Sequence, residues 1–245
     1  MWQRKSCPIL FLDLNQTLQH TKISARERNY LFLAGIFITS LTLGNVVGVT
    51  KFVDLGKFLG VIPAGLFAYP ITFLATDLIS ELYGRSRAQA VVWVGFFMNF
   101  LILFLMWAGH VFPDASGVSG AAATFESLYD FMKPNVVASM IAYLIAQSFD
   151  VRAFHFWKNV TKGRHLWLRN IASTTASQVI DTIAILSILY ASGGLGDSID
   201  SPAALIGLMW ASYKFKFLFA LADTPFFYLG VYLLNDAVGE DSKLG

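Results

Sequence analysis

Long apolar stretches alternate with short polar segments along most of this chain. A helix rises about 1.5 Å per residue, so roughly 20 apolar residues are needed to cross the hydrocarbon core of a bilayer. We therefore predict six transmembrane helices within residues 29–236, between a cytoplasmic N-terminal tail (1–28) and a cytoplasmic C-terminal tail (237–245). The predicted spans are about Tyr30–Thr50, Phe58–Tyr83, Ala88–Val111, Phe131–Phe149, Leu166–Tyr190 and Ala203–Leu234.

Basic residues gather on one side of this predicted bundle. With the N-terminus inside, thirteen Lys and Arg residues lie in inner segments, whereas the outer segments hold only Lys51, Lys57 and Lys133. Lys and Arg concentrate on the cytoplasmic side of membrane proteins. The pattern predicts an all-α integral membrane bundle of six helices with both termini in the cytoplasm.

Composition agrees with a membrane protein. Hydrophobic residues make up 56% of the chain and charged residues 14%, whereas soluble domains carry about 25% charged residues. The net charge of +2 gives no reason to expect a nucleic-acid partner. The single cysteine, Cys7, excludes a disulfide framework and lies far from any histidine cluster, so neither a metal ion nor a cofactor is expected.

Charged residues inside the spans are informative, because a charge at the bilayer centre costs about 2.5–3.5 kcal/mol. Asp181 lies near the middle of the fifth span and shares a helical face with Gln178. Lys214 and Lys216 lie at a similar depth in the sixth span. We expect one of these lysines to neutralise Asp181 across the helix interface.

Two further spans carry polar residues at helical spacing. The fourth span presents Asn135, Tyr143, Gln147 and Asp150 on one face, and the second presents Tyr69, Phe73, Asp77 and Glu81. Such side chains either line a solute path or join membrane helices without any ligand. Both interpretations stay open from spacing alone.

Four acidic residues fall toward the predicted cytoplasmic ends of the spans, close to arginines. They suggest an ion-pair belt or an inner gate that also carries protons. The residues in question are Asp77, Glu81, Asp150 and Asp223, with Arg85 among the basic neighbours.

Two local motifs point elsewhere. Gly44 and Gly48 form a Gly-x-x-x-Gly pattern typical of close helix packing, which suggests a homodimer.

The segment 117–120, Gly-Val-Ser-Gly, is similar to the serine motif of rhomboid proteases, but the sixth span holds no histidine to activate the serine. An intramembrane enzyme is therefore disfavoured.

The motifs taken together resemble the queuosine precursor transporters, a family grouped with vitamin uptake transporters. The resemblance covers about residues 30–235 and rests on several elements in the right order. They are Asp77-Leu78-Ile79-Ser80-Glu81-Leu82-Tyr83-Gly84-Arg85, then Ala138-Ser139 with Gln147 and Asp150, then Ser173, Ser177-Gln178 and Asp181-Thr182, then Lys216 with Asp223-Thr224-Pro225.

This resemblance implies import of 7-cyano- or 7-aminomethyl-7-deazaguanine across a bacterial inner membrane, for the synthesis of the tRNA nucleoside queuosine. A carboxylate accepts the two adjacent N–H donors of such a base, and an amide or ammonium satisfies its carbonyl. Asp181, Gln178 and Lys216 supply these groups, with Lys216 as counter-ion or carbonyl donor. The remaining expected cavity residues are Asn135, Gln147, Tyr143, Tyr69 and Phe73, of which the aromatic rings would stack on the base.

Three alternatives stay open at this point. The chain would serve as the substrate-binding subunit of an ATPase-driven vitamin uptake system, as an intramembrane enzyme, or as a structural protein whose polar stripes only join helices. The sequence does not separate proton-coupled transport from facilitated diffusion.

Overall fold

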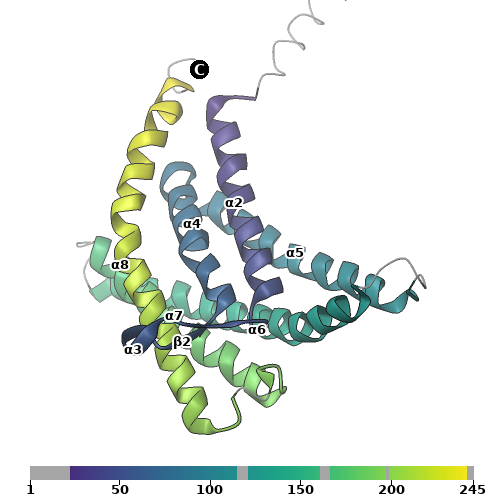
Figure 1. The fold of residues 1–245 in the computed structure, drawn as a ribbon. Helices are drawn as coiled ribbons and strands as arrows, with labels where there is room; N and C mark the ends of the chain where they lie inside the picture. Colours follow the sequence, from purple (N-terminus) through teal and green to yellow (C-terminus); the bar gives the residue numbers. More distant parts are fainter. Residues whose placement is uncertain (1–22, 115–120, 161–165, 197–198, 242–245) are drawn as a thin grey trace, which may run out of the picture.

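The computed structural model describes residues 23–114, 121–160, 166–196 and 199–241. Within these ranges the chain is mostly helical (Figure 1), and each of its six longest helices overlaps one predicted span. These helices are α2 (Ala25–Val47), α4 (Tyr69–Tyr83), α5 (Arg85–Val111), α6 (Ala122–Val160), α7 (Leu166–Ala191) and α8 (Pro202–Asp241).

Three of these helices contain a stretch long and apolar enough to cross a membrane. The stretches are Ala25–Val47 in α2, Ser86–Val111 in α5 and Pro202–Asp223 in α8. Shorter apolar stretches, Thr175–Ala191 and Pro225–Leu234, lie in α7 and α8. The helical, membrane-embedded character of the chain is thus confirmed, whereas the number of spans and their orientation stay predictions.

The second predicted span differs most from expectation. We predicted one helix from about Phe58 to Tyr83, but helix α4 begins only at Tyr69. The preceding residues form strand β1 (Phe52–Asp54), helix α3 (Gly56–Leu59), strand β2 (Val61–Pro63) and the 3₁₀ helix η1 (Ala64–Ala68). The two strands pair antiparallel, with Val53 opposite Ile62.

Glycine and proline explain this break. Gly56 and Gly60 both adopt φ +78°, a conformation that lets the chain turn back on itself. Pro63 lacks the N–H that a continuing helix needs. Pro70 lies in the first turn of α4, where proline is well tolerated.

Helices α6 and α8 are longer than the spans predicted in them. Helix α6 continues through Pro134 and helix α8 through Pro225, and they contain 39 and 40 residues. Both therefore extend beyond the stretch that a bilayer core requires.

A glycine contact joins α2 to η1. A Cβ atom at Gly65 would lie 2.4 Å from the carbonyl oxygen of Gly44 and 2.7 Å from the Cα of Gly48, so only glycine fits there. The predicted Gly-x-x-x-Gly packing motif is therefore used within one chain. This removes the basis on which we expected a homodimer.

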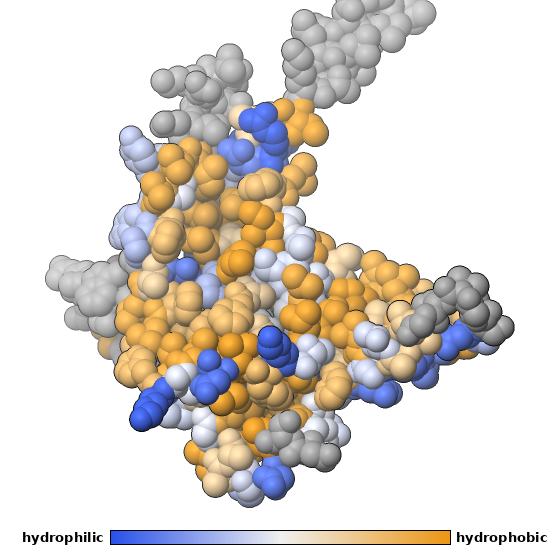
Figure 2. All heavy atoms as spheres, in the orientation of Figure 1, coloured by the Kyte–Doolittle hydropathy of each residue, from blue (hydrophilic) through white to orange (hydrophobic). Residues whose placement is uncertain are grey.

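The surface is largely apolar. Figure 2 shows hydrophobic side chains over most of the visible face of α2, α4 and α8, with hydrophilic groups near the start of α2. Helix α5 exposes large side chains along its length: Trp93, Phe97, Phe100, Phe104 and Trp107. Lipid chains, rather than water, suit such a surface.

Candidate functional site

An ion pair between helices α7 and α8 lies at the centre of the site. Lys216 of α8 places Nζ 2.7 Å from Oδ2 of Asp181 of α7. The Lys216 side chain is 1% exposed and that of Asp181 is 15% exposed. The expected neutralisation of Asp181 is confirmed, and Lys216 is the lysine that provides it. Lys214 instead donates to the Phe58 carbonyl oxygen, at 2.6 Å.

The Lys216 ammonium contacts two further groups. Besides Asp181, Nζ donates to the Thr182 hydroxyl at 3.1 Å and lies 4.1 Å from the centroid of the Tyr69 ring. A cation is attracted to the face of an aromatic ring. These contacts hold Lys216 in place as the counter-ion of Asp181.

The two oxygens of Asp181 have different environments. Oδ2 accepts from Lys216 and also from the Tyr69 hydroxyl, at 3.0 Å. Oδ1 has no partner among the residues that the structure describes. Asp181 therefore presents one free acceptor atom toward the space beside it.

That space is a cavity of about 360 Å³ bounded by helices α2, α4, α5, α6 and α7. Its volume falls within the usual range for sites that bind small molecules. Asp181 and Gln178 lie in one wall, one helical turn apart on α7. The other polar lining residues include Asn45, Asn99, Thr72, Thr76, Asp77, Ser80, Gln89, Ser139, Tyr143 and Ser177.

Two side chains in this cavity have polar groups that the protein leaves unsatisfied. Gln178 is 4% exposed, yet its amide has no hydrogen-bond partner in the described part of the chain. The Tyr143 hydroxyl is buried and likewise has no partner there. Buried polar groups are nearly always paired with protein or water. These groups are therefore available to a bound solute or to water.

Aromatic rings form two sides of the same cavity. Tyr69 and Phe73 have ring centroids 5.8 Å apart, and Phe96 and Tyr143 have centroids 6.4 Å apart. Flat ligands stack favourably on such rings, at about 1–3 kcal/mol per base in nucleic-acid complexes. The predicted aromatic residues Tyr69, Phe73 and Tyr143 all line the cavity.

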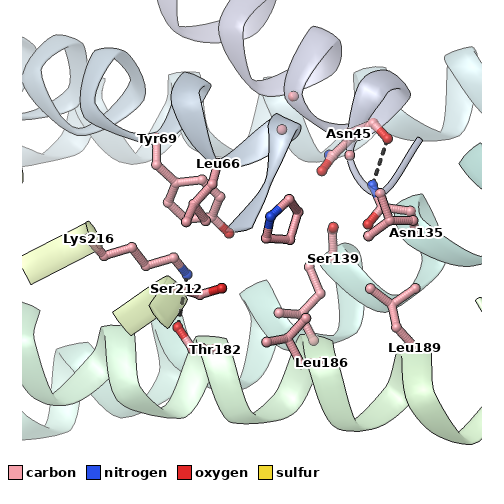
Figure 3. Close-up of a pocket in the computed structure, with 16 residues that line it drawn as sticks. Asn45, Leu66, Tyr69, Asn135, Ser139, Thr182, Leu186, Leu189, Ser212 and Lys216 are labelled. Carbon is pink, nitrogen blue, oxygen red and sulfur yellow. Dashed lines mark hydrogen bonds between the residues drawn. The ribbon is translucent and has the colours of Figure 1, made fainter. Parts of the chain in front are cut away.

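A second, smaller cavity of about 50 Å³ adjoins the first, and Tyr69, Gly65, Gly44, Asn45 and Ser139 line both. Figure 3 shows Lys216, Thr182 and Ser212 on one side of it and Asn45 and Asn135 on the other. The Ser212 hydroxyl is buried without a partner among the described residues. A polar space of this size suits a few water molecules.

Sequence reasoning missed two cavity residues, Asn45 and Asn99. Both are buried amides in apolar helices, at 9% and 3% exposure. A signal was present, because a polar side chain inside a span calls for a partner or a cavity. We applied that argument only to charged residues and to polar residues that recur at helical spacing on one face of a span. Asn45 and Asn99 belong to neither group.

The other predicted site residues differ in where they lie relative to the large cavity. Asn135 lines only the small cavity and donates to the Asn45 carbonyl oxygen, at 2.7 Å. Asp77 lines the large cavity. The side chains of Gln147, Asp150 and Arg85, and the serine motif at 117–120, lie outside the described part of the chain.

The remaining inner acids show no ion pair within the described ranges. Glu81 is exposed and Asp223 is half-buried. Nearby, Arg87 lies over the Tyr30 ring, 5.4 Å from its centroid. The belt of ion pairs is therefore not seen among these side chains, and an inner gate stays a prediction.

Comparison with known proteins identifies a family. The family described as "Putative vitamin uptake transporter" matches residues 63–230. This match covers more than half of the chain and includes helices α4 to α7 and most of α8.

Curated bacterial relatives are similar over most of their length. "Probable queuosine precursor transporter" of Bacillus subtilis (strain 168) is 30% identical over 166 residues, which cover 67% of this chain and 69% of the relative. "Queuosine precursor transporter" of Escherichia coli (strain K12) is 29% identical over 178 residues, covering 70% and 72%. The Haemophilus influenzae relative, "Probable queuosine precursor transporter", is 24% identical over 176 residues, covering 71% and 66%. No solved structure matches the chain.

Proposed function

Because the chain belongs to the family described as "Putative vitamin uptake transporter", whose members are transporters and not enzymes, we propose that it imports a 7-deazaguanine precursor of queuosine. The relatives described above are named queuosine precursor transporters, which supports a queuosine precursor as the solute. The single observation that supports the proposal most is the free Asp181 Oδ1 beside the unpaired Gln178 amide in an aromatic-lined cavity.

The polar groups of Asp181 and Gln178 in the cavity wall suit the pairing edge of such a base. That edge presents two adjacent N–H donors next to a carbonyl acceptor. Asp181 accepts both N–H groups through its two oxygens, and the Gln178 amide donates to the carbonyl. Lys216 lies in direct contact with Asp181 as its counter-ion.

The aromatic residues hold the flat face of the base. In this proposal the rings of Tyr69 and Phe73 lie on one side of the base and those of Phe96 and Tyr143 on another. A flat heterocycle then buries its apolar faces while its polar edge is read by hydrogen bonds. Small-molecule sites usually combine apolar contacts to the faces of the ligand with a few hydrogen bonds to its polar groups.

We further propose six spans with both termini in the cytoplasm of a bacterial cell, in the inner membrane. The distribution of Lys and Arg supports this orientation. The cavity runs from Tyr69 at the start of α4 to Ser80 and Gln89 near the α4–α5 junction. In the proposed orientation this junction is cytoplasmic, and we propose that the cavity faces the inside of the cell.

Transport by the purified chain tests the proposal. Proteoliposomes that contain only this protein should accumulate labelled 7-cyano-7-deazaguanine, whereas empty liposomes and liposomes with Asp181→Asn should not. Uptake without any ATPase also excludes the role of a substrate-binding subunit. Failure of the wild-type protein to bind or move either 7-deazaguanine base would overturn the proposal.

In cells, the same proposal predicts rescue of tRNA modification. A strain that lacks its own precursor synthesis and transport should regain queuosine in tRNA from low external precursor when it expresses this chain. The Gln178→Ala variant, at equal membrane abundance, should need a higher external concentration. Wild-type behaviour of both Asp181→Asn and Gln178→Ala would exclude these residues from the binding site.

A further inference from the structure

A chain of hydrogen-bonded amides joins helices α5, α2 and α6, and two of its members, Asn99 and Asn45, line the large cavity. Asn99 of α5 donates through Nδ2 to the Gly95 carbonyl oxygen, at 3.0 Å. Asn45 of α2 donates through Nδ2 to Oδ1 of Asn99, at 2.8 Å. Asn135 of α6 donates to the Asn45 main-chain oxygen.

This network fixes which atom of each amide points where. A main-chain carbonyl only accepts, so Asn99 must turn its Nδ2 toward Gly95 and its Oδ1 toward Asn45. Asn45 must then donate with Nδ2, which leaves its Oδ1 as an acceptor. The orientation of the Asn45 amide therefore follows from the hydrogen bonds.

The Asn45 amide retains unused hydrogen-bonding capacity. Its Oδ1 and one N–H have no partner among the described residues, although the side chain is nine-tenths buried. Asn45 lines both cavities, and Figure 3 shows it across the small cavity from Thr182 and from Lys216, whose ammonium contacts Asp181. A buried amide with a free acceptor and a free donor is costly unless a ligand or water uses it.

We infer that Asn45, held in place by Asn99, binds the N3/N9 edge of the base and selects a free base over its nucleoside. This inference rests on the proposed function. In a 7-deazaguanine, that edge presents the N3 acceptor next to the N9–H donor. These atoms match the free N–H and Oδ1 of Asn45. A nucleoside or a 9-methyl base has no N9–H and leaves Oδ1 of Asn45 buried without a partner.

The experiment compares two ligands that differ only at N9. Binding of labelled 7-cyano-7-deazaguanine to the purified wild-type protein is competed with unlabelled 7-cyano-7-deazaguanine and with its 9-methyl derivative. The wild-type protein should prefer the free base by roughly tenfold to a hundredfold, the usual consequence of one unpaired buried polar group. Equal competition by both ligands would overturn the inference while leaving the proposed function intact.

Variants of Asn45 distinguish a role in recognising the base from a role in packing the helices. Asn45→Ser keeps a small polar side chain but loses the free carbonyl acceptor, so the preference for the free base should fall to less than about threefold. Asn45→Ala, if it folds, should show the same reduced preference for the free base. Ser212→Ala is the control, since its unpaired hydroxyl lines only the small cavity, and it should leave the ratio unchanged.

The ratio of the two affinities is the decisive readout, because loosened packing weakens both ligands together. A preserved ratio in Asn45→Ser would show that Asn45 only joins helices, and it would overturn the inference. Absence of binding of either base to the wild-type protein would instead refute the proposed function, and this inference with it.

Discussion

The Tyr69 hydroxyl and the Lys216 ammonium share one oxygen of Asp181, at 3.0 Å and 2.7 Å. A carboxylate oxygen offers two lone pairs, so Oδ2 is fully occupied while Oδ1 is free. A ligand that needs both oxygens of Asp181 must therefore displace one of these two donors. The tyrosine is the weaker of them, because it carries no charge.

This competition predicts the effect of Tyr69→Phe. The change keeps the ring that lies over Lys216 but removes the hydroxyl that the base must displace. Affinity for 7-cyano-7-deazaguanine should therefore rise about threefold to tenfold, the value of one hydrogen bond to a charged group after partial compensation. Titration of the purified protein by isothermal calorimetry measures it, and weaker binding would show that the hydroxyl contacts the base directly.

Removal of one partner of the ion pair should be costly. Lys216→Met leaves Asp181 buried beside an apolar side chain, and loss of one member of a buried pair costs about 3–5 kcal/mol. We expect a much lower yield of folded protein and a lower midpoint of thermal unfolding in detergent.

The double variant Asp181→Asn/Lys216→Met is the control for this prediction. It removes both charges, so most of the lost stability should return, but uptake should stay absent because the amide that replaces the Asp181 carboxylate has only one acceptor oxygen and cannot accept both N–H groups of the base. Recovered uptake in the double variant would argue that the pair is only structural.

The unpaired Tyr143 hydroxyl predicts opposite effects on stability and binding. Tyr143→Phe removes a buried group without a partner, so the ligand-free protein should become more stable by about 1 kcal/mol. Affinity for the base should fall if the ligand satisfies this hydroxyl, as we propose. Thermal unfolding with and without 7-cyano-7-deazaguanine reports both quantities.

Ser212→Ala is the matched control, since its hydroxyl is equally unpaired but lines only the small cavity. It should stabilise the ligand-free protein without changing the affinity for the base. A loss of affinity in Ser212→Ala equal to that of Tyr143→Phe would contradict the placement of the base in the large cavity.

The glycine contact between α2 and η1 predicts a sharp difference between two alanine substitutions. Gly65→Ala places a methyl group against the main chain of Gly44 and Gly48 and should destabilise the protein by about 1–3 kcal/mol. Gly35→Ala, in α2, meets nothing within 4 Å and should be neutral or slightly stabilising. Equal thermal stabilities would mean that α2 and η1 separate easily.

Much of this architecture follows from the sequence because it depends on hydrophobic length and on helical spacing. The pairing of Asp181 with a lysine of similar depth was predictable for the same reason, since two charges in hydrocarbon must compensate each other. Spacing also placed Gln178 and Asp181 on one face. These inferences need no knowledge of how the helices pack.

Other features depend on long-range packing and were out of reach. The segment before α4 is as apolar as a span, yet Gly56, Gly60 and Pro63 fold it into a short hairpin. The choice between Lys214 and Lys216 depends on which side of α8 faces α7. Asn45 and Asn99 became recognisable as a unit only when α2 and α5 were seen side by side.

The glycine contact also constrains how the protein moves. With no side chain between Gly65 and the Gly44–Gly48 segment, η1 and the end of α2 have no room to slide and should travel as one rigid piece. Lys214 reaches the Phe58 carbonyl across a different boundary, between α8 and α3, through a long flexible side chain. Any opening toward the far side of the membrane is therefore expected at this boundary, and spin labels on α3 and α8 would move apart while labels on α2 and η1 would not.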